Sequence, residues 1–518
     1  MKHPTTDKYQ QLLIKSGLFW TGPTKGSFGL PPRGYALWKN IQTILDRKFS
    51  RRGVRNVLLP TLIPFDLLAK EKDHITGFSP ECFYVEKIGA KNLTSPLVLR
   101  PTSEVMFYSW YQQTLRSYHQ LPFLFNQWCS VFRAEKNTKP FFRNTEFLWQ
   151  EGHTIHISET EAQQFALDIL SDYQDYAENI LNLAVIVGHK TEGEKFAGAL
   201  ETYTVECLLP DGQCLQLATS HYFGDHFCRL MDVKFQGSDP KEEQQFPYST
   251  SWGTSTRAIG AIVKTHSDHW GLILPFDIAP VQIAFILFQE TPELIDYYQE
   301  VYSLLIPHYR CKLYNQSKKN LLQADEEGCP FKIILGPEEL EKKEITLVRR
   351  DDVERRITIK LTQESEFEKK ILPLHEDFAE KTNKLIFPHH SPAQLAEEKA
   401  KMVKQIQKGA WSGKLFQIID QQVAEFSRVI YQKSVDFRDS HIYRVGSLAE
   451  LEKKLNEEKI GLFLVPFCHS LECEKKIKVQ VPAYSIRCVA ENEKITQGEN
   501  CLFCFQRAKI RVYLGRSY

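Results

Sequence analysis

The sequence has almost no net charge and no long apolar run. It holds 65 Lys and Arg against 64 Asp and Glu, a formal net charge of +1 over 518 residues. Binding to a nucleic acid would therefore depend on a local basic patch. The most apolar run, residues 279–288, has half the length that crosses a bilayer, and the first ten residues contain no apolar segment of a secretory signal. We expect a cytoplasmic protein that does not enter a membrane.

The sequence also contains no internal repeat, no low-complexity tract and no glycine-rich phosphate-binding loop. A chain of this length exceeds one ordinary core, so we expect two to four domains. Its hydrophobic content of 42% and charged content of 25% are those of a globular protein. The twelve cysteines are expected to be reduced or metal-bound rather than paired in disulfides.

The first 275 residues combine amphipathic helices with strand-like runs. Residues 34–49 have the apolar spacing of a helix, and Ser158 with Glu161 forms a capping box that opens a second helix. Residues 202–220 predict a hairpin with its turn at 210–212. Strands joined by hairpins indicate an antiparallel sheet.

From residue 276 onward, buried apolar strands alternate with helices. Residues 281–288, 331–336 and 344–352 predict strands, and residues 291–305 predict a helix. This alternation is typical of a small α/β domain. The domain limits are placed near Pro275 and near the two prolines of residues 387–392. The predicted domains are residues 1–275, 276–386 and 387–518.

Two close cysteine pairs near the end of the chain indicate a metal site. Cys468 lies close to Cys473 in the sequence, and Cys501 lies close to Cys504. Four thiolates are the ligand set of a tetrahedral structural Zn²⁺ site. The alternative is four free cysteines, which the tight pairing disfavours. Cys488 lies between the pairs and is interpreted as a core residue.

The run FLWQEGH, residues 147–153, is predicted to place aromatic and ionisable side chains on one face. If it forms a strand, alternate residues point the same way, so Phe147, Trp149, Glu151 and His153 share one surface. Three arginines, Arg133, Arg143 and Arg257, also occur in otherwise apolar strand or helix-start contexts. Each could be an ordinary surface residue. Together they indicate a polyphosphate substrate, because guanidinium groups bind phosphate oxygens with two parallel hydrogen bonds.

These runs resemble the motifs of class II aminoacyl-tRNA synthetases, and closely those of the prolyl-tRNA synthetases of archaeal and eukaryotic type, over nearly the whole chain. GVRNVLLPTLIPF resembles motif 1, and VLRPTSE the proline-site loop. NQWCSVFRAE with PFFRNTEFLWQEGH resembles motif 2, and SWGTSTRAIG motif 3. VRRDD resembles a stretch of the anticodon-binding domain, and the four cysteines with GRSY resemble the C-terminal zinc domain.

The resemblance implies an α+β multidomain fold. It consists of an antiparallel-sheet catalytic domain, an α/β anticodon-binding domain and an α/β C-terminal zinc-binding domain, over the three ranges above. The resemblance further implies ligation of L-proline to tRNA(Pro) with ATP and Mg²⁺, through prolyl-adenylate and then transfer to the terminal adenosine of the tRNA. It implies a homodimer, through motif 1, with structural Zn²⁺ and with no membrane or DNA partner.

Roles for individual residues follow from the same resemblance. Arg133 and Arg257 are implied to be catalytic. The residues implied to bind proline are Thr102, Glu104, Arg133, Phe147, Trp149, Glu151, His153, His221 and Ser251. Those implied to bind ATP are Arg133, Glu135, Arg143, Gln216, Thr219 and Arg257. Those at the anticodon positions are Asp325, Lys332 and Arg349, where Asp325 and Lys332 replace the family's Glu and Arg and keep the charge but not the reach.

Two other functions compete with proline ligation. A degenerate synthetase that only binds tRNA is disfavoured because the arginines and pocket carboxylates are all present. Specificity for threonine is disfavoured because motif 2 lacks the Cys and two His of that family's zinc site. The stretch between His153 and Ser251 is filled by the predicted helix and hairpin, which leaves no room for an inserted editing domain. Activation of cysteine or alanine is therefore expected, because a missing methylene is worth only ~1–3 kcal/mol.

Overall fold

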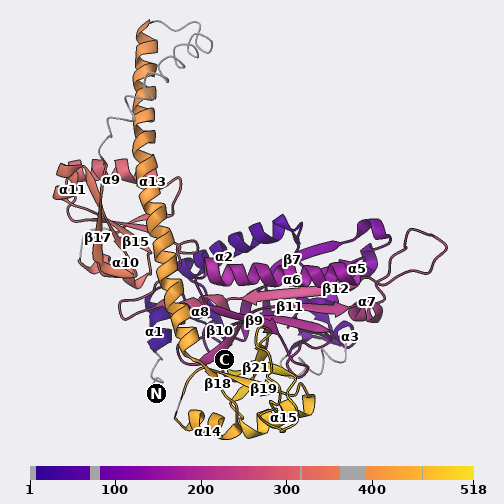
Figure 1. Cartoon of the computed structure of the whole chain (residues 1–518). Helices are drawn as coiled ribbons and strands as arrows, with labels where there is room; N and C mark the ends of the chain where they lie inside the picture. Colours follow the sequence, from indigo (N-terminus) through magenta and orange to yellow (C-terminus); the bar gives the residue numbers. More distant parts are fainter. Residues whose placement is uncertain (1–7, 71–81, 315–317, 362–391, 458) are drawn as a thin grey trace. The chain divides into compact units, whose positions relative to one another are not determined.

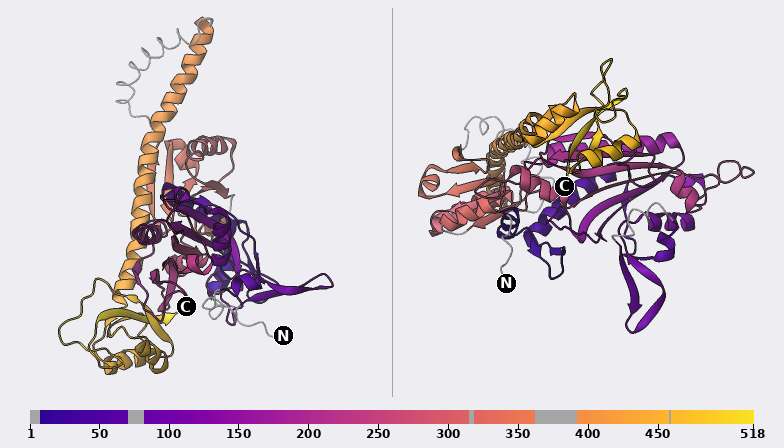
Figure 2. Two further views of the ribbon diagram at one scale, coloured as in Figure 1. Left: turned by 90° about the vertical axis from the view of Figure 1, so that its right-hand side faces the viewer. Right: turned by 90° about the horizontal axis from the view of Figure 1, so that it is seen from below.

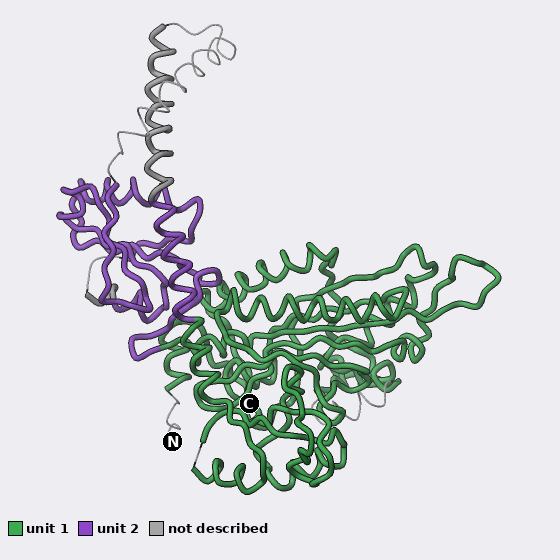
Figure 3. Tube along the Cα trace, viewed as in Figure 1, with its two compact units in different colours: residues 1–267, 431–518 green, residues 268–430 purple. Residues whose placement is uncertain are grey.

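The computed structural model describes residues 8–70, 82–314, 318–361, 392–457 and 459–518. For residues 318–321 and 392–414 it describes the backbone only. The chain forms two compact units (Figure 3). The first comprises residues 1–267 and 431–518, and the second residues 268–430. The predicted limit after residue 386 lies outside the described residues, and the three-domain division stays a prediction.

The first unit is built on a sheet of eleven strands (Figure 1). Its main path runs β18-β19-β21-β11-β12-β8-β7-β3, with β10 and β9 extending from β11 and β20 beside β21. The strands are β3 (Arg55–Asn56), β7 (Phe123–Phe132), β8 (Glu146–His156), β9 (Val185–His189), β10 (Glu201–Leu208), β11 (Gln213–Gly224), β12 (Tyr248–Ser255), β18 (Ile442–Arg444), β19 (Leu462–Phe467), β20 (Tyr484–Val489) and β21 (Ile510–Ser517).

The central strands β7, β8, β12, β11 and β10 are antiparallel to their neighbours in this run, which confirms the predicted antiparallel sheet. The predicted hairpin is β10–β11. At its turn, Gly212 has a φ of 76°, and a Cβ there would lie 2.5 Å from Ile460 Cβ, so the turn requires glycine. Smaller sheets are formed by β1 (Trp20–Thr21) with β2 (Phe28–Gly29), and by β4 (Leu62–Pro64), β6 (Lys91–Leu99) and β5 (Phe83–Ile88).

Helix α6 (Glu159–Asp175) packs on the sheet through a buried stripe of Ala162, Ala166, Ile169 and Tyr173. Ser158 Oγ accepts the hydrogen bond of the Glu161 backbone N–H at 3.3 Å, which is one half of the predicted capping box. The Glu161 carboxylate faces His156 Nδ1, at 3.2 Å, in place of the other half. The predicted helix at 34–49 is α2 (Pro32–Arg51). The other helical segments of this unit are α1 (Lys8–Lys15), α3 (Phe65–Leu68), α5 (Glu104–Thr114), η2 (Tyr118–Gln120), the π-helical turn η3 (Tyr176–Ile180), α7 (His226–Leu230), α8 (Arg257–His266), α14 (Leu448–Asn456) and α15 (Leu471–Gln480).

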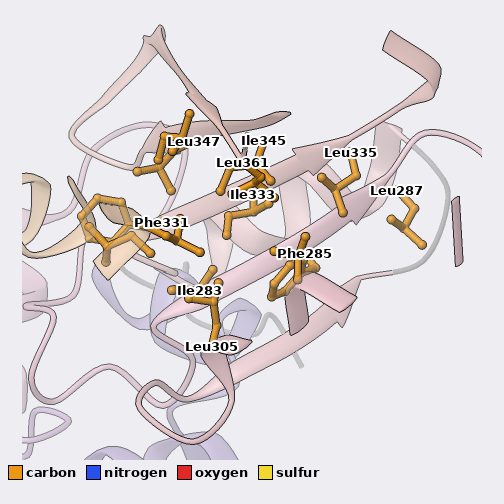
Figure 4. Close-up of a cluster of buried hydrophobic side chains, with 14 of the residues drawn as sticks. Ile283, Phe285, Leu287, Leu305, Phe331, Ile333, Leu335, Ile345, Leu347 and Leu361 are labelled. Carbon is orange, nitrogen blue, oxygen red and sulfur yellow. The ribbon is translucent and has the colours of Figure 1, made fainter. Parts of the chain in front are cut away.

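The second unit has a five-stranded mixed sheet in the order β14-β13-β15-β16-β17. Its core gathers Ile283, Phe285, Phe331, Ile333 and Leu347, all buried (Figure 4). The strands and the helix predicted for this region are confirmed. The elements are β13 (Ile283–Leu287), α9 (Pro292–Leu305), β14 (Cys311–Tyr314), α10 (Lys318–Glu326), β15 (Phe331–Leu335), α11 (Pro337–Lys342), β16 (Glu344–Arg349) and β17 (Asp352–Lys360).

Helix α13 (Pro392–Ser440) begins within the second unit's residue range and ends within the first's. It is the longest of the described helices, and like the others it lacks the apolar character needed to cross a membrane.

The C-terminal segment, residues 442–518 and yellow in Figure 2, continues the large sheet. Strand β21 pairs in parallel with the start of β11. In the same unit, Glu206 on β10 accepts from Lys190 Nζ at 2.7 Å through Oε1 and from Arg487 Nη2 at 2.7 Å through Oε2. All three side chains are buried. Two cations thus share one carboxylate in the interior, and removal of the carboxylate would leave both cations unpaired.

Acid should weaken this buried cluster in a defined pH window. Burial favours a higher pKa for Glu206, but the charges of Arg487 and Lys190 hold its pKa at about 2, below the ordinary 4.5. Because the pKa is lower in the folded state, the stabilisation is complete above pH 4.5 and is lost as the pH falls toward 2. We expect Glu206→Gln to lose about 3 kcal/mol of unfolding free energy at pH 7, with a flatter acid dependence in that window, measured by urea unfolding.

The Glu452→Gln variant serves as the control, because Glu452 is exposed in the same unit. It should unfold like the parent protein. Equal acid dependence in the parent and in Glu206→Gln would contradict the role given to the cluster.

Candidate active site

A cavity of about 290 Å³ lies in the first unit, over strands β8, β11 and β12. Twelve of the predicted substrate residues line it, and they come from six separate parts of the chain: the start of α5 with the loop before it, the residue after β7, and β8, β11, β12 and α8. These residues are Thr102, Glu104, Arg133, Phe147, Trp149, Glu151, His153, Gln216, Thr219, His221, Ser251 and Arg257.

The alternation predicted for FLWQEGH is confirmed by the structure. Phe147, Trp149, Glu151 and His153 lie on β8 and all face the cavity. The rings of Phe147 and Trp149 meet edge to face, with centroids 6.1 Å apart. They form an apolar wall, whereas Glu151 and His153 are polar and fully enclosed, with 3% and 1% of their surfaces exposed. One strand therefore supplies both an aromatic and an ionisable part of the cavity.

Glu151 is held by a set of buried donors. Its Oε1 accepts from Ser103 Oγ at 2.5 Å and from Gln127 Nε2 at 2.6 Å, and its Oε2 lies 3.2 Å from His153 Nε2. Burial alone would raise the pKa of Glu151, but His153, Ser103 and Gln127 together hold it below its ordinary value. Glu151 is therefore ionised at neutral pH despite its burial.

Glu104 lies beside this group at the first residue of α5. The Thr102 hydroxyl donates to its carboxylate, and both side chains are buried. Glu104, Glu151 and His153 each place one side-chain oxygen or nitrogen atom within 4.8 Å of those of the other two. Two carboxylates and an imidazole at this spacing form an acidic corner of the cavity, whose chemistry suits a cation.

The arginines provide the opposite charge. Arg133 follows the end of β7 and donates from Nε and Nη2 to the Pro101 carbonyl oxygen at 3.2 and 3.1 Å. Its guanidinium lies over the rings of Phe147 and Trp149, at 5.5 and 5.4 Å. Arg257 Nε donates to the Phe142 carbonyl oxygen at 3.1 Å. Arg133 is thereby placed between the aromatic wall and the loop that precedes α5.

The electrostatic surroundings of Arg257 favour an anion. Burial and the nearby charges of Arg133 and Arg143 lower the pKa of Arg257 to about 10. The group remains charged at neutral pH, and the nearby Glu135 offsets only part of the positive charge of Arg133 and Arg143 around it. An anionic ligand in this place would relieve the repulsion among the three guanidinium groups.

Glu135 and Arg143, predicted as ATP residues, do not line the cavity. They lie in the loop between β7 and β8 and face each other, with Arg143 Nη1 3.5 Å from Glu135 Oε2. Arg143 also donates from Nε and Nη2 to the backbone oxygen of Tyr518, at 3.2 and 2.8 Å. Their assignment to ATP stays a prediction.

Sequence reasoning missed one wall of the cavity. Glu194, Lys195 and Phe196 line it from the loop between β9 and β10, and Thr202 lines it from β10. This loop has neither the helical nor the strand period, so no periodicity marks it. The only signal in the sequence is its glycine spacing, with Gly193 and Gly198 on either side of Phe196.

The predicted metal ligands are brought together. Cys468, Cys473, Cys501 and Cys504 place their sulfur atoms within 4.8 Å of one another, and Cys473 Sγ lies 3.6 Å from Cys501 Sγ. Zn–S bonds of about 2.3 Å in a tetrahedron require sulfur atoms roughly 3.8 Å apart. The four thiols therefore fit a structural Zn²⁺ ion.

The three residues at the predicted anticodon positions are buried in the second unit. Lys332 Nζ donates to both carboxylate oxygens of Asp325, at 2.6 Å each. Arg349 donates to both carboxylate oxygens of Asp351, at 2.9 and 2.6 Å. A contact of these side chains with RNA would require these ion pairs to open. Their predicted role is not tested by this arrangement and stays a prediction.

Comparisons with known families match this architecture segment by segment. The tRNA synthetase class II core domain of the G, H, P, S and T group matches residues 83–266, and the anticodon binding domain matches residues 278–371. The C-terminal domain of prolyl-tRNA synthetase matches residues 448–518. The chain contains the core domain of a class II aminoacyl-tRNA synthetase, which confirms the predicted catalytic and anticodon-binding domains.

Relatives that match nearly the whole chain identify the family within this class. Proline--tRNA ligase of Mesoplasma florum is 39% identical over 513 residues, 98% of this chain and 96% of the relative. Proline--tRNA ligase 2 of Bacillus thuringiensis (strain Al Hakam) is 37% identical over 515 residues, with the same coverage. Prolyl-tRNA synthetase from Cryptosporidium parvum, solved with halofuginone and AMPPNP, has a TM-score of 0.82 at 30% identity and covers 98% of this chain and 94% of its own. The chain belongs to the prolyl-tRNA synthetases, which are proline--tRNA ligases.

Metal analysis tests the cysteine cluster. We expect about one zinc ion per purified chain, as a four-thiolate site holds one ion. The double variant Cys473→Ser/Cys501→Ser removes two adjacent ligands and should contain almost none after gel filtration in chelator. Cys488→Ala, at a buried cysteine outside the cluster, should keep its zinc. Equal zinc in the double variant and the parent would rule out these four ligands.

Proposed function

We propose that this cavity activates L-proline with ATP and that the chain then transfers the prolyl group to tRNA(Pro). The observation that carries the proposal is the meeting of three features in one cavity: the aromatic wall of Phe147 and Trp149, the acidic corner at Glu104 and Glu151, and the guanidinium of Arg133. Each feature matches a different part of a proline zwitterion. Its family membership supports the same substrate.

The three parts of proline fit the three features. The apolar ring is suited to the faces of Phe147 and Trp149. The secondary ammonium is suited to the carboxylates of Glu104 and Glu151. Both are buried, and their attraction for a cation is stronger there because little water competes. The carboxylate is suited to Arg133, whose charge lies beside the same aromatic wall. Thr102, His153, His221 and Ser251 complete the proposed proline site.

ATP is proposed to occupy the arginine side of the cavity. Arg133 and Arg257 line this side and repel each other in the free protein, so a polyphosphate would be bound with relief of that repulsion. Gln216 and Thr219 of β11 provide further polar contacts. Glu135 is proposed to lie near the adenine and Arg143 near the outer phosphates. Mg²⁺ bound with ATP would supply further compensation of the phosphate charge.

The proposed chemistry is an in-line displacement. A carboxylate oxygen of proline forms a bond to the α-phosphorus, and the bond from that phosphorus to the bridging oxygen breaks, which releases pyrophosphate. Arg133 and Arg257 stabilise the charge on the phosphoryl oxygens. The terminal ribose hydroxyl of the tRNA then attacks the acyl carbon, and AMP leaves. The residues act by position and charge, since no step requires a covalent enzyme intermediate.

The remaining parts of the proposal concern partners. The segment that matches the anticodon binding domain is proposed to contact tRNA(Pro). A homodimer, with the motif 1 region in the interface, and a cytoplasmic location are also proposed. A solved relative from Cryptosporidium parvum, described as complexed with L-proline and AMP, is consistent with the two small substrates.

Arginine removal tests the assigned reaction. We expect Arg133→Ala to lower proline-dependent ATP–pyrophosphate exchange by at least about 100-fold, since it removes a charge aimed at the reacting phosphate, while the circular dichroism spectrum is unchanged. Arg229→Ala, at a surface arginine of α7, should exchange normally. Retained exchange in Arg133→Ala would contradict the assignment. Absence of exchange in the parent would instead indicate a tRNA-binding protein without catalysis.

Amino acids smaller than proline test the selectivity of the cavity. The segment between β8 and β12 forms α6, the π-helical turn, β9, β10, β11 and α7, all within the first unit, so we propose that no separate editing domain is inserted there. Cysteine and alanine should support exchange with kcat/KM roughly 10- to 200-fold below that for proline per missing methylene. Background values for both amino acids, with proline active, would refute this expectation.

A further inference from the structure

The loop between β9 and β10 forms the missed wall of the cavity. Glu194, Lys195 and Phe196 of this loop line it. The Phe196 ring lies 4.6 Å from the ring of His221, and Thr202 Oγ1 lies 3.0 Å from His221 Nδ1. The loop therefore contacts a residue of the proposed proline site, and its position affects the shape of that part of the cavity.

Helix α15 of the C-terminal segment holds this loop. Glu474 Oε2 accepts the backbone N–H of Gly193 at 2.6 Å. One turn further along the helix, Lys478 Nζ lies 3.1 Å from Glu194 Oε1. Glu474 is buried, with 6% of its surface exposed. A buried carboxyl oxygen that accepts from an enclosed backbone N–H makes a hydrogen bond whose loss leaves a buried donor without a partner.

Gly193 is what permits this contact. A Cβ on Gly193 would lie 1.9 Å from Glu474 Oε2 and 3.1 Å from Leu471 Cδ1. Any other residue would therefore push the carboxylate away from the amide. The contact therefore depends both on Gly193, which has no Cβ, and on the carboxylate of Glu474.

We propose that Glu474 is a positioning residue that fixes residues 190–196, the first part of the β9–β10 loop, against the cavity and thereby sets the affinity for proline. This inference rests on the proposed function of the cavity. Glu474 follows Cys473 of the four-cysteine cluster directly in the chain, so the helix that carries a proposed metal ligand also supports the wall of the amino-acid site. Its effect passes through Phe196 and His221 rather than through a contact with the reacting atoms.

Three single variants separate this role from a general structural one. Glu474→Ala removes the acceptor, Glu474→Gln keeps a side-chain oxygen in place, and Glu472→Ala removes the same charge from an exposed position of the same helix. The Kd for proline is measured by calorimetry without ATP, together with the KM for proline, the KM for ATP and the zinc content.

We expect Glu474→Ala to raise the Kd and the KM for proline roughly 10-fold, as the loss of a buried hydrogen bond would, with the KM for ATP and the zinc content unchanged. Glu474→Gln should bind proline within about 3-fold of the parent, because a neutral acceptor remains. Glu472→Ala should match the parent. Unchanged proline binding in Glu474→Ala would overturn the proposal, and so would an equal loss of affinity for proline and ATP.

A second pair of variants gives an independent decision, including the case in which Glu474→Ala loses zinc or does not fold. Gly193→Ala displaces the Glu474 carboxylate and should weaken proline binding selectively by itself, and unchanged binding would overturn the proposal. Where Glu474→Ala folds, adding Gly193→Ala to it should cost little more, because the contact is already absent. Additive losses would show that the two residues act separately. If the parent protein itself fails to bind proline, the proposed function fails, whereas the positioning role fails only when the parent binds and the variants match it.

Discussion

The cavity depends on a carboxylate that is buried and yet must stay charged. A buried acid is normally driven toward its neutral form, and a neutral acid holds a cation weakly. Glu151 avoids this because Ser103 and Gln127 donate to one of its oxygens and His153 lies beside the other. These donors come from the loop before α5, from β7 and from β8 itself. The ionised state of one side chain thus requires that three separate segments be packed correctly.

The same sheet brings opposite charges into one small volume. Carboxylates at Glu104 and Glu151 form one charged corner, and Arg133 and Arg257 carry the other sign. Phe147 and Trp149 provide an apolar wall beneath the Arg133 guanidinium. A zwitterion with an apolar ring, placed next to a polyanion, can satisfy all of these groups at once, whereas a simple anion or cation satisfies only some of them. This combination favours the proposed activation of an amino acid over phosphate binding alone.

Local patterns predicted the face of β8 and the cysteine cluster, whereas the site residues on α5, β11 and β12 were implied only by the family resemblance. The strand period alone is enough to place Phe147, Trp149, Glu151 and His153 on one face, and the close spacing of the cysteines indicates the cluster. The loop of residues 190–196 could not be found this way, because a loop has no period and its position is set by a helix that lies 281 residues later in the chain at Glu474. The pairing of Glu135 with Arg143 was likewise invisible, since the sequence shows charge but not which partner a flexible side chain takes.

The C-terminal segment belongs to the same compact unit as the cavity. Strand β21 pairs with β11, and β11 carries Gln216, Thr219 and His221 on the cavity wall. Arg487 of β20 shares Glu206 with Lys190, so the hairpin β10–β11 is anchored from below by a residue of that segment. Backbone pairing, a buried charge cluster and the Glu474–Gly193 contact all connect the segment to the same two strands and loop. Three contacts of different chemistry at one junction constrain the cavity wall more tightly than any one of them could, because a movement that preserves one contact breaks another.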